Sequence, residues 1–178
     1  IPWHRRLLTV EDTAELQVYH DHWLRMETRR ERPDGTPEVD MNDCLKSSLR
    51  MRPDRIIVGE VRGPEAATLL TAMNTGHDGS FGSLHANTAQ ETVTRMINPP
   101  MLVPPIMLTG LDLIIIQARL HVNGKTARKI TEVAEIAGME GTKPRLNVIW
   151  KYNPANDRIE ETGIPSKLRE TICQAAGI

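Results

Sequence analysis

The stretch RIIVGEVRG, residues 55–63, decides how the rest of the sequence is interpreted. It opens with the β-branched run Ile56–Val58, and a continuous apolar run of this kind is typical of a strand covered on both faces. Glu60 follows the run, so its carboxylate would emerge at the carboxyl end of that strand. There an acid can orient water or the hydration shell of Mg²⁺. The alternative is a surface acid at the end of a strand, and the stretch alone leaves both open.

The composition is that of an ordinary globular chain. The 178 residues are 39% hydrophobic and 25% charged, with a net charge of −1. This balance indicates no general preference for nucleic acid or anionic membranes, and an aromatic content of 3% argues against base-stacking platforms. Cys44 and Cys173 form no C-x-x-C pair, which excludes a disulfide framework or a four-cysteine zinc site within this chain. Such cysteine usage suits a reducing, cytoplasmic compartment.

The start of the chain is unusual. It begins at Ile1 rather than at a methionine, and no signal peptide is visible. No apolar run approaches the roughly 18 residues of a membrane span. We therefore expect the chain to begin inside a longer polypeptide, although a processed start would have the same appearance.

Strand and helix patterns alternate along the first part of the chain, which predicts a parallel α/β sheet; the second part turns antiparallel. The segment 13–39 is polar and interrupted by RPDGTPE, so we expect it to be extended or to form a hairpin. Asn123-Gly124 predicts a type I′ hairpin turn. Strands are expected at 5–12, 55–60, 80–85, 111–120, 127–136 and 145–152. Helices are expected at 41–51, 65–75, 89–97 and 165–176.

Capping residues mark the expected helix ends. Asp40 is a good N-cap for the first helix, and Thr88 with Glu91 fits a capping box. Pro64 is expected at the first position of its helix. Helix stops are expected at Gly76 and Gly177.

These patterns predict one α/β domain in two parts. Residues 1–120 would form a partial core, with a mostly parallel sheet flanked by helices. Residues 121–178 would extend the same domain with an antiparallel hairpin, a strand and a helix.

Three polar clusters are predicted at or just beyond the carboxyl ends of strands, the edge at which open α/β sheets bind ligands. The first is TVEDTAEL, residues 9–16. The second is RPDRIIVGEVRGPEA, residues 52–66, around Glu60. The third is TGHDGSFGSLHANT, residues 75–88.

The first and third clusters offer acid–base chemistry. Glu15 lies three residues after Asp12 and could accept a proton from an attacking water, the alternative being a solvated acidic loop. His77 and His85 flank a glycine-rich strand. A neutral histidine can donate to a γ-phosphate and a cationic one can stabilise developing charge, although a histidine at a strand end is often structural. No Cys, His or Asp group has the spacing of a zinc site.

Several arginines line the polar segment and the first helix. Acids are interleaved with them, so an ordinary solvated surface is the simplest interpretation. A nucleic-acid face is one alternative, and an arginine finger that reaches a neighbour's phosphate is another. These residues are Arg25, Arg29, Arg30, Arg50 and Arg52.

In this order, the three clusters resemble the motor ATPases of secretion systems and type IV pili, a RecA-like superfamily. TVEDTAEL is similar to their Asp box, RPDRIIVGEVRGPEA to their atypical Walker B motif, and TGHDGSFGSLHANT to their His box. The similarity runs from about residue 1 to about residue 140. SLHANTAQETVTRM followed by NPPMLVP is most similar to the archaeal branch.

The resemblance implies a RecA-like fold and ATP hydrolysis with Mg²⁺ by a homohexamer of the complete protein. That motor would drive assembly of a type IV pilus or archaellum, or type II-like protein secretion. It would work at the cytoplasmic face of the membrane, held peripherally through an inner-membrane platform protein, with no nucleic-acid partner.

The resemblance also assigns roles to single residues. Glu15 corresponds to a proposed general base, and Glu60 to the Walker B glutamate, which would reach Mg²⁺ through water. His77 and His85 correspond to the two His-box positions that sense or contact the γ-phosphate. Nucleotide contacts are expected from Glu11, Asp12, Gly59 and Arg62. Candidates for an intersubunit arginine are Arg29, Arg30 and Arg50.

The sequence contains no G-x-x-x-x-G-K-[ST] loop, the backbone cradle for phosphates. In this family the loop lies just upstream of the Asp box. We therefore expect the chain to be the C-terminal portion of a motor whose cradle precedes Ile1. On its own, the chain should show weak or no ATP binding and no turnover.

Two alternatives stay open. The chain could be a non-catalytic partner or interaction module that has lost its P-loop, and a P-loop encoded directly upstream would decide against this. It could also belong to a RecA-like nucleic-acid motor, which a salt-dependent DNA-binding assay would test.

Overall fold

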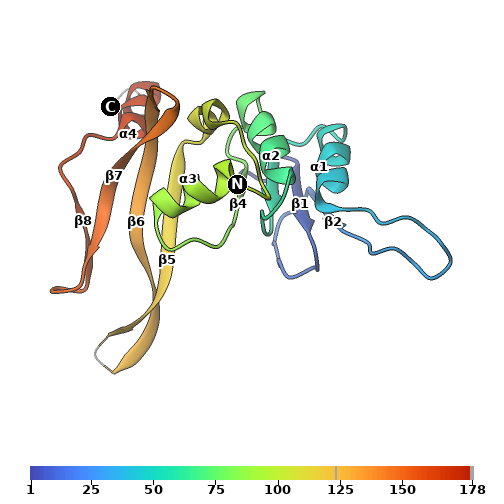
Figure 1. Cartoon of the computed structure of the whole chain (residues 1–178), viewed down its shortest axis with the longest axis horizontal. Coiled ribbons are helices and arrows are strands. Elements are labelled where there is room, and N and C mark those ends of the chain that lie inside the picture. Colours follow the sequence, from blue (N-terminus) through green and yellow to red (C-terminus); the bar gives the residue numbers. More distant parts are fainter. Residues whose placement is uncertain (123, 177–178) are drawn as a thin grey trace. The chain divides into compact units, whose positions relative to one another are not determined.

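The computed structural model describes residues 1–122 and 124–176, and these residues form two units. The first unit comprises Ile1–Leu84 with Pro99–Val103, and the second comprises His85–Asn98 with Pro104–Ile178. Each unit carries its own four-stranded sheet (Figure 1). The domain boundary expected near residue 120 stays a prediction.

The sheet of the first unit is parallel, with the strand order β2-β1-β3-β4 (Figure 1). Because its strands run in the same direction, their carboxyl ends share one edge, as the alternating pattern predicts. We call this the carboxyl edge. The strands are β1 (Leu7–Glu11), β2 (Trp23–Glu27), β3 (Arg55–Val58) and β4 (Phe81–Gly82).

The apolar runs form the core of the first unit. Every residue of β1 is buried, and so is the run Ile56–Val58 of β3, as expected for strands covered on both faces. The helices α1 (Met41–Leu49) and α2 (Glu65–Asn74) pack against each other, and α1 contacts both β1 and β2. Burial of each of these Leu or Ile side chains contributes about 1.5–3 kcal/mol to the free energy of folding.

The start of α1 is capped as predicted, whereas the start of α2 differs by one residue from the prediction. The Asp40 carboxylate accepts the Asp43 N–H at 2.7 Å, and the Asp43 carboxylate accepts the Asp40 N–H at 3.4 Å, which completes a capping box. α2 begins at Glu65, so Pro64 occupies the N-cap rather than the predicted first helical position. Gly76 follows the helix with φ +99°, a value that favours glycine and agrees with its predicted role as a stop.

One strand of the first unit was not expected, and another is shorter than expected. The polar segment 13–39 contains the extended strand β2, which pairs in parallel with β1 across a long loop, and this agrees with the expected extended or hairpin conformation. Only 29–39 forms a hairpin, closed by a bridge between Arg29 and Val39. The strand expected at 80–85 is shorter, since pairing with β3 is confined to Phe81–Gly82.

The second unit contains an antiparallel sheet with the strand order β5-β6-β7-β8. The hairpin between β5 and β6 is confirmed. Asn123, on which the predicted turn type depends, lies outside the described residues, and so does the predicted helix stop Gly177. Strand β8 and the short helix η1 were not expected from the sequence. The strands are β5 (Leu113–Val122), β6 (Lys125–Glu140), β7 (Lys143–Asn153) and β8 (Arg158–Glu161), and η1 is Pro105–Gly110.

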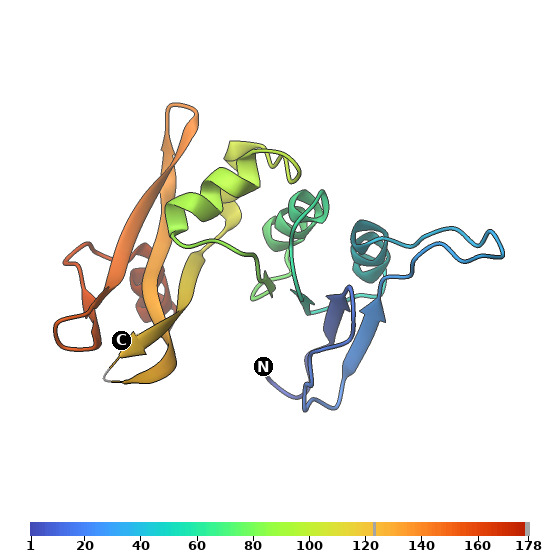
Figure 2. The same cartoon turned by 60° about the horizontal axis from the view of Figure 1, so that its bottom comes forward.

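Two helices attach to this sheet through glutamates of β6. Helix α3 (Ala89–Ile97) lies against β5, β6 and β7 (Figure 2), and its first N–H, from Ala89, donates to Glu132 at 3.2 Å. The first N–H of helix α4 (Lys167–Ala176), from Lys167, donates to Glu135 of the same strand. Because side chains alternate along a strand, Glu132 and Glu135 point to opposite faces of the sheet.

The described residues include no helix with the length and apolar character needed to cross a bilayer. Both cysteines are free, and burial raises the pKa of the Cys44 thiol, which makes it unreactive.

Candidate functional site

Three charged side chains meet at the carboxyl edge of the parallel sheet. Asp12 directly follows β1, and Glu60 and Arg62 follow β3. The Arg62 guanidinium donates to the Asp12 carboxylate and lies 4.0 Å from the Glu60 carboxylate. The structure therefore brings together residues that are 48 and 50 positions apart, as the strand-end argument predicts.

Asp12 is held in its charged form. The Thr28 hydroxyl donates to its carboxylate at 2.6 Å, and Arg62 donates to its other oxygen. These two hydrogen bonds, with Thr28 the larger cause, lower the pKa of Asp12 below its ordinary value. At neutral pH the edge thus carries a fixed negative charge beside a fixed positive one.

Glu15 and Glu11 differ in their environments. The Glu15 side chain is exposed, while its backbone N–H donates to Glu11 at 3.0 Å. Glu11, the last residue of β1, is only 3% exposed. The buried Glu11 carboxylate, which accepts backbone N–H groups, therefore has a structural role. The exposed Glu15 carboxylate is accessible to a ligand.

Gly59 leaves room for Glu11. A Cβ atom at position 59 would lie 3.1 Å from the Glu11 Cγ atom and 3.6 Å from the Val10 carbonyl oxygen. Both neighbours belong to β1. A larger side chain in front of Glu60 would therefore push the Glu11 carboxylate out of its position.

The three arginine candidates lie in different places. Arg30 is exposed and lines a pocket together with Asp12 and Arg62. Arg29 donates to the Pro37 carbonyl at 3.0 Å inside the 29–39 hairpin. Arg50 caps the carboxyl end of α1, which runs back toward the start of β3, so it lies at the opposite edge from Glu60. Of these three candidates, Arg30 alone is both exposed and at the carboxyl edge.

That pocket has a volume of about 330 Å³ and belongs entirely to the first unit. The starts of α1 and α2 line it together with acids and arginines, so the positive ends of two helices lie beside it. Its lining residues are Asp12, Thr28, Arg30, Glu38, Asp40, Met41, Asn42, Arg62, Gly63, Pro64 and Glu65.

His77 does not lie at the carboxyl edge, so the expectation for its position is wrong. Its N–H and its Nδ1 atom both contact the Ala72 carbonyl at the end of α2. The Ser80 hydroxyl donates to the His77 carbonyl and accepts the Ile56 N–H near the start of β3. Because α2 carries the chain back across the sheet, His77 lies at the amino edge.

His85 is exposed and opens the second unit, in the segment between β4 and α3. Its candidate role stays a prediction. The capping residue Thr88 follows it closely and accepts the Glu91 N–H at 3.0 Å, while the Glu91 carboxylate binds Asn87. The expected start of α3 is thus confirmed, although Glu91 does not close a capping box.

The residues present at the carboxyl edge fit a magnesium ion bound through water. Within the described ranges, no three His, Cys, Asp or Glu side chains are grouped to hold a metal on their own. Mg²⁺ does not require such a group, because it keeps several waters and takes one or two carboxylates together with substrate phosphates. Glu60, with a side chain that is 40% exposed, suits that mode.

Sequence reasoning missed the support that β2 gives to this edge, although it named Arg25 among the candidate arginines. Arg25 in the middle of β2, Glu27 at its end and Thr28 just after it all contact the segment after β1. The signal was available in WLRME, residues 23–27, where apolar and charged residues alternate. The surrounding polar segment obscured it.

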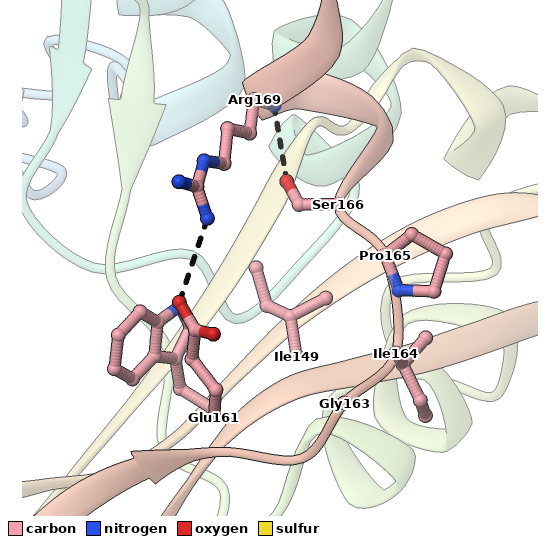
Figure 3. A pocket seen from close by; sticks show the side chains of 8 residues that line it. Ile149, Glu161, Gly163, Ile164, Pro165, Ser166 and Arg169 are labelled. Atoms are coloured by element: carbon pink, nitrogen blue, oxygen red, sulfur yellow. Dashed lines mark hydrogen bonds and ion pairs between the residues drawn. The ribbon is translucent and has the colours of Figure 1, made fainter.

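A second pocket, of about 410 Å³, lies in the second unit beside the start of α4 (Figure 3). The Arg169 side chain reaches the Glu161 carboxylate at 3.5 Å, and the Arg169 N–H donates to the Ser166 hydroxyl. The sequence selected none of its described lining residues. They are Ile149, Trp150, Glu161, Gly163, Ile164, Pro165, Ser166 and Arg169.

Comparison with known proteins identifies the family. The family described as type II/IV secretion system protein matches residues 2–148. An uncharacterized protein of Methanocaldococcus jannaschii is 36% identical over all of this chain and 66% of its own length. A putative conjugal transfer protein of Mycobacterium tuberculosis is 40% identical over 80% of this chain and 42% of its own length.

Solved structures show the same fold. The VirB11 ATPase of the Brucella suis type IV secretion system, in complex with sulphate, has a TM-score of 0.60 and 28% identity. That likeness covers 76% of this chain and 41% of VirB11. The pilus retraction motor PilT with bound ADP has a TM-score of 0.51 and 27% identity over 97% of this chain and 44% of PilT.

These comparisons confirm the predicted fold class, a mixed α/β fold with a parallel sheet flanked by helices and an antiparallel extension. The chain spans 66% or less of the length of these relatives. Since the family match extends over most of the sequence, the chain belongs to the type II/IV secretion system protein family.

Proposed function

We propose that the chain forms the acid-bearing part of a motor ATPase that hydrolyses ATP to drive pilus or archaellum assembly or protein secretion. The observation that carries the proposal is the meeting of Asp12, Arg62 and Glu60 at the carboxyl edge of a parallel sheet. In open α/β sheets this edge is where ligands bind.

Each side chain has a proposed task. Glu60 orients the attacking water, and Glu15, exposed at the same edge, accepts its proton. Arg62 is charged at every physiological pH, so it can offset negative charge that builds up on the transferred phosphate. Its contact with Asp12 keeps it at that edge.

ATP and Mg²⁺ are the proposed cofactors. Glu60 would hold the ion through water, and the ion would neutralise charge on the phosphate oxygens. The sequence has no G-x-x-x-x-G-K-[ST] loop, so the phosphate cradle would come from a segment outside these 178 residues. The length of the relatives supports this, because the chain spans less than half of VirB11 and of PilT.

The proposed assembly is a homohexamer at the cytoplasmic face of the membrane, in contact with an inner-membrane platform protein. Arg30 is the best placed candidate for an arginine that reaches the nucleotide of a neighbouring subunit, because it is exposed beside Asp12. His85 remains the proposed γ-phosphate contact. His77, bound to the end of α2, would act indirectly.

The proposal is tested by Glu60→Gln in the full-length protein. This change keeps the shape of the side chain but removes the carboxylate, so we expect turnover to fall at least about a hundredfold while ATP binding is retained. Glu31→Gln, an exposed acid in the 29–39 hairpin, is the control and should keep wild-type turnover. Retained hydrolysis by Glu60→Gln would remove Glu60 from the mechanism.

One alternative has an observation in its favour. The missing phosphate loop also suits a non-catalytic partner of such a machine, which would use the same fold as an interaction module. An ATPase assay on the full-length protein separates the two, because a partner of this kind would show no turnover with or without Glu60.

A further inference from the structure

The segment that carries Glu15 has no secondary structure of its own, but side chains of the chain bind its backbone. Residues Asp12–Leu16, which we call the Asp-box loop, follow β1 and contain no helix or strand. A loop of this kind depends on the groups that satisfy its backbone. In this chain those groups are charged side chains.

Two carboxylates accept the N–H groups of this loop. One oxygen of Glu11 accepts from Glu15 at 3.0 Å and from Leu16 at 2.8 Å. Glu27, at the end of β2, accepts from Ala14 at 2.6 Å. Three successive amides that could have contacted a phosphate are therefore occupied by acids of the chain itself.

Arg25 completes the hold from the other side. Its guanidinium donates to the Leu16 carbonyl and lies 3.7 Å from the second oxygen of Glu11. It also stacks on the Trp23 ring, 4.5 Å from the ring centroid. Leu16 is thus bound at its N–H by Glu11 and at its carbonyl by Arg25.

Because Glu11 is buried, disruption of this arrangement requires a large free energy. Glu11 is 3% exposed, and its second oxygen has no hydrogen-bond partner among the described residues, leaving Arg25 as its compensating charge. A buried carboxylate without its partners costs several kcal/mol in general, so the loop and the pair stabilise each other.

We propose that Glu11, paired with Arg25, is a positioning residue that holds the Asp-box loop and thereby places Glu15 at the carboxyl edge. Glu11 acts through the loop backbone rather than by contact with nucleotide or metal. The proposal rests on the proposed function for the task of Glu15, whereas the hold on the loop is independent of it.

The length of the side chain separates this role from that of a charged ligand. Glu11→Gln keeps the reach and one acceptor oxygen, while Glu11→Asp keeps the charge but is one methylene shorter. We expect amide exchange at Glu15 and Leu16 to accelerate severalfold in Glu11→Gln and at least about tenfold in Glu11→Asp. A direct ligand of magnesium or nucleotide would favour Asp over Gln.

Kinetics of the full-length protein provide the second measurement. Misplacement of Glu15 should lower kcat about ten- to hundredfold in Glu11→Asp, less in Glu11→Gln, with the KM for MgATP within about twofold. Arg25→Gln should also accelerate exchange at Leu16. Arg32→Gln, an exposed arginine at the tip of the 29–39 hairpin, is the matched control.

The outcomes are distinct. Unchanged exchange in Glu11→Asp, or a raised KM with unchanged kcat, overturns the positioning role. If the wild-type protein shows no turnover, the proposed function fails, while the exchange rates still decide whether Glu11 holds the loop. Thermal unfolding identifies any variant that is not folded, and Arg25→Gln then tests the same clamp from its exposed side.

Discussion

At the scale of single residues, Gly59 illustrates how closely the strands β1 and β3 meet below the candidate site. Here the space is filled by the Glu11 side chain, since a Cβ atom at position 59 would lie 3.1 Å from its Cγ atom. The Glu11 carboxylate at the end of β1 thus occupies the space that a side chain at position 59, just after β3, would need.

Gly59→Ala tests this close approach. The added methyl group must displace Glu11, so we expect a loss of about 1–3 kcal/mol in the free energy of unfolding and faster amide exchange at Glu15. Urea unfolding and exchange measurements check both. In a Glu11→Ala background the tight contact with Cγ is gone and only ordinary van der Waals contacts remain, so a cost that stays the same there would contradict the account.

The pH dependence of stability is expected to involve Asp12. Its folded-state pKa lies below the ordinary value because Thr28 and Arg62 donate to the carboxylate. The stabilisation is therefore present above the unfolded-state pKa and is lost as the pH falls through the folded-state pKa, below about pH 4. Between about pH 4 and pH 2, wild-type protein should lose stability more steeply than Asp12→Asn.

Thr28→Val is the companion variant, because it removes the largest cause of the lowered pKa. NMR titration of the Asp12 carboxyl should show its pKa rising toward the ordinary value. An unaltered titration curve would mean that the Thr28 hydroxyl is not responsible.

At the scale of elements, the attachment of α4 depends on one carboxylate. Glu135 is 3% exposed and accepts from the Ser166 hydroxyl, from the Lys167 N–H at 2.9 Å and from the Leu168 N–H at 3.3 Å. It caps the helix from a strand some 30 residues earlier in the chain. The negative charge also lies at the positive end of the helix.

Glu135→Ala should release the start of α4. Three donors would lose a charged acceptor, so we expect a loss of about 1–3 kcal/mol and faster proteolysis within α4. Glu140→Ala, an exposed acid at the end of the same strand, serves as the control. Equal proteolysis in the two variants would show that Glu135 does not anchor the helix.

The elements that could be predicted are those with a local cause. The apolar run of β3, the cap Asp40 and the stop Gly76 each act on the adjacent backbone, and each is confirmed. Strand β2 was missed because its stability comes from β1, with which it pairs through a long loop. Sequence patterns report local preferences, whereas such pairing is decided by the tertiary structure.

The candidate site follows the same rule. The proximity of Asp12 and Glu60 could be predicted from the sequence, because each follows a strand of one parallel sheet. The hold of Glu11 and Arg25 on the Asp-box loop could not, since it depends on side-chain directions around an irregular segment. His77 was misplaced because a helix of ten residues separates it from that edge.

At the scale of the whole molecule, the 178 residues should lack part of the contacts that a nucleotide needs. Without a phosphate-binding loop, the 178-residue chain should bind MgATP weakly or not at all and show no measurable turnover. Isothermal titration calorimetry checks this, with the full-length protein as the comparison. Tight binding of MgATP by the chain alone would contradict it.

Nucleic-acid binding should be weak. The net charge of −1 and the aromatic content of 3% provide neither a basic surface nor stacking platforms. Fluorescence anisotropy with labelled DNA at low and high salt measures this. Strong binding that weakens steeply with salt would instead support the nucleic-acid motor.

The short strand β4 has a consequence for the handling of this protein in solution. Among the described strands it pairs with β3 alone, and that pairing covers only Phe81 and Gly82. Very short edge strands are one way in which natural sheets limit edge-to-edge association, because they leave too few backbone groups in line for another chain to pair with. The brevity of β4 should therefore help to keep concentrated samples of this protein monodisperse.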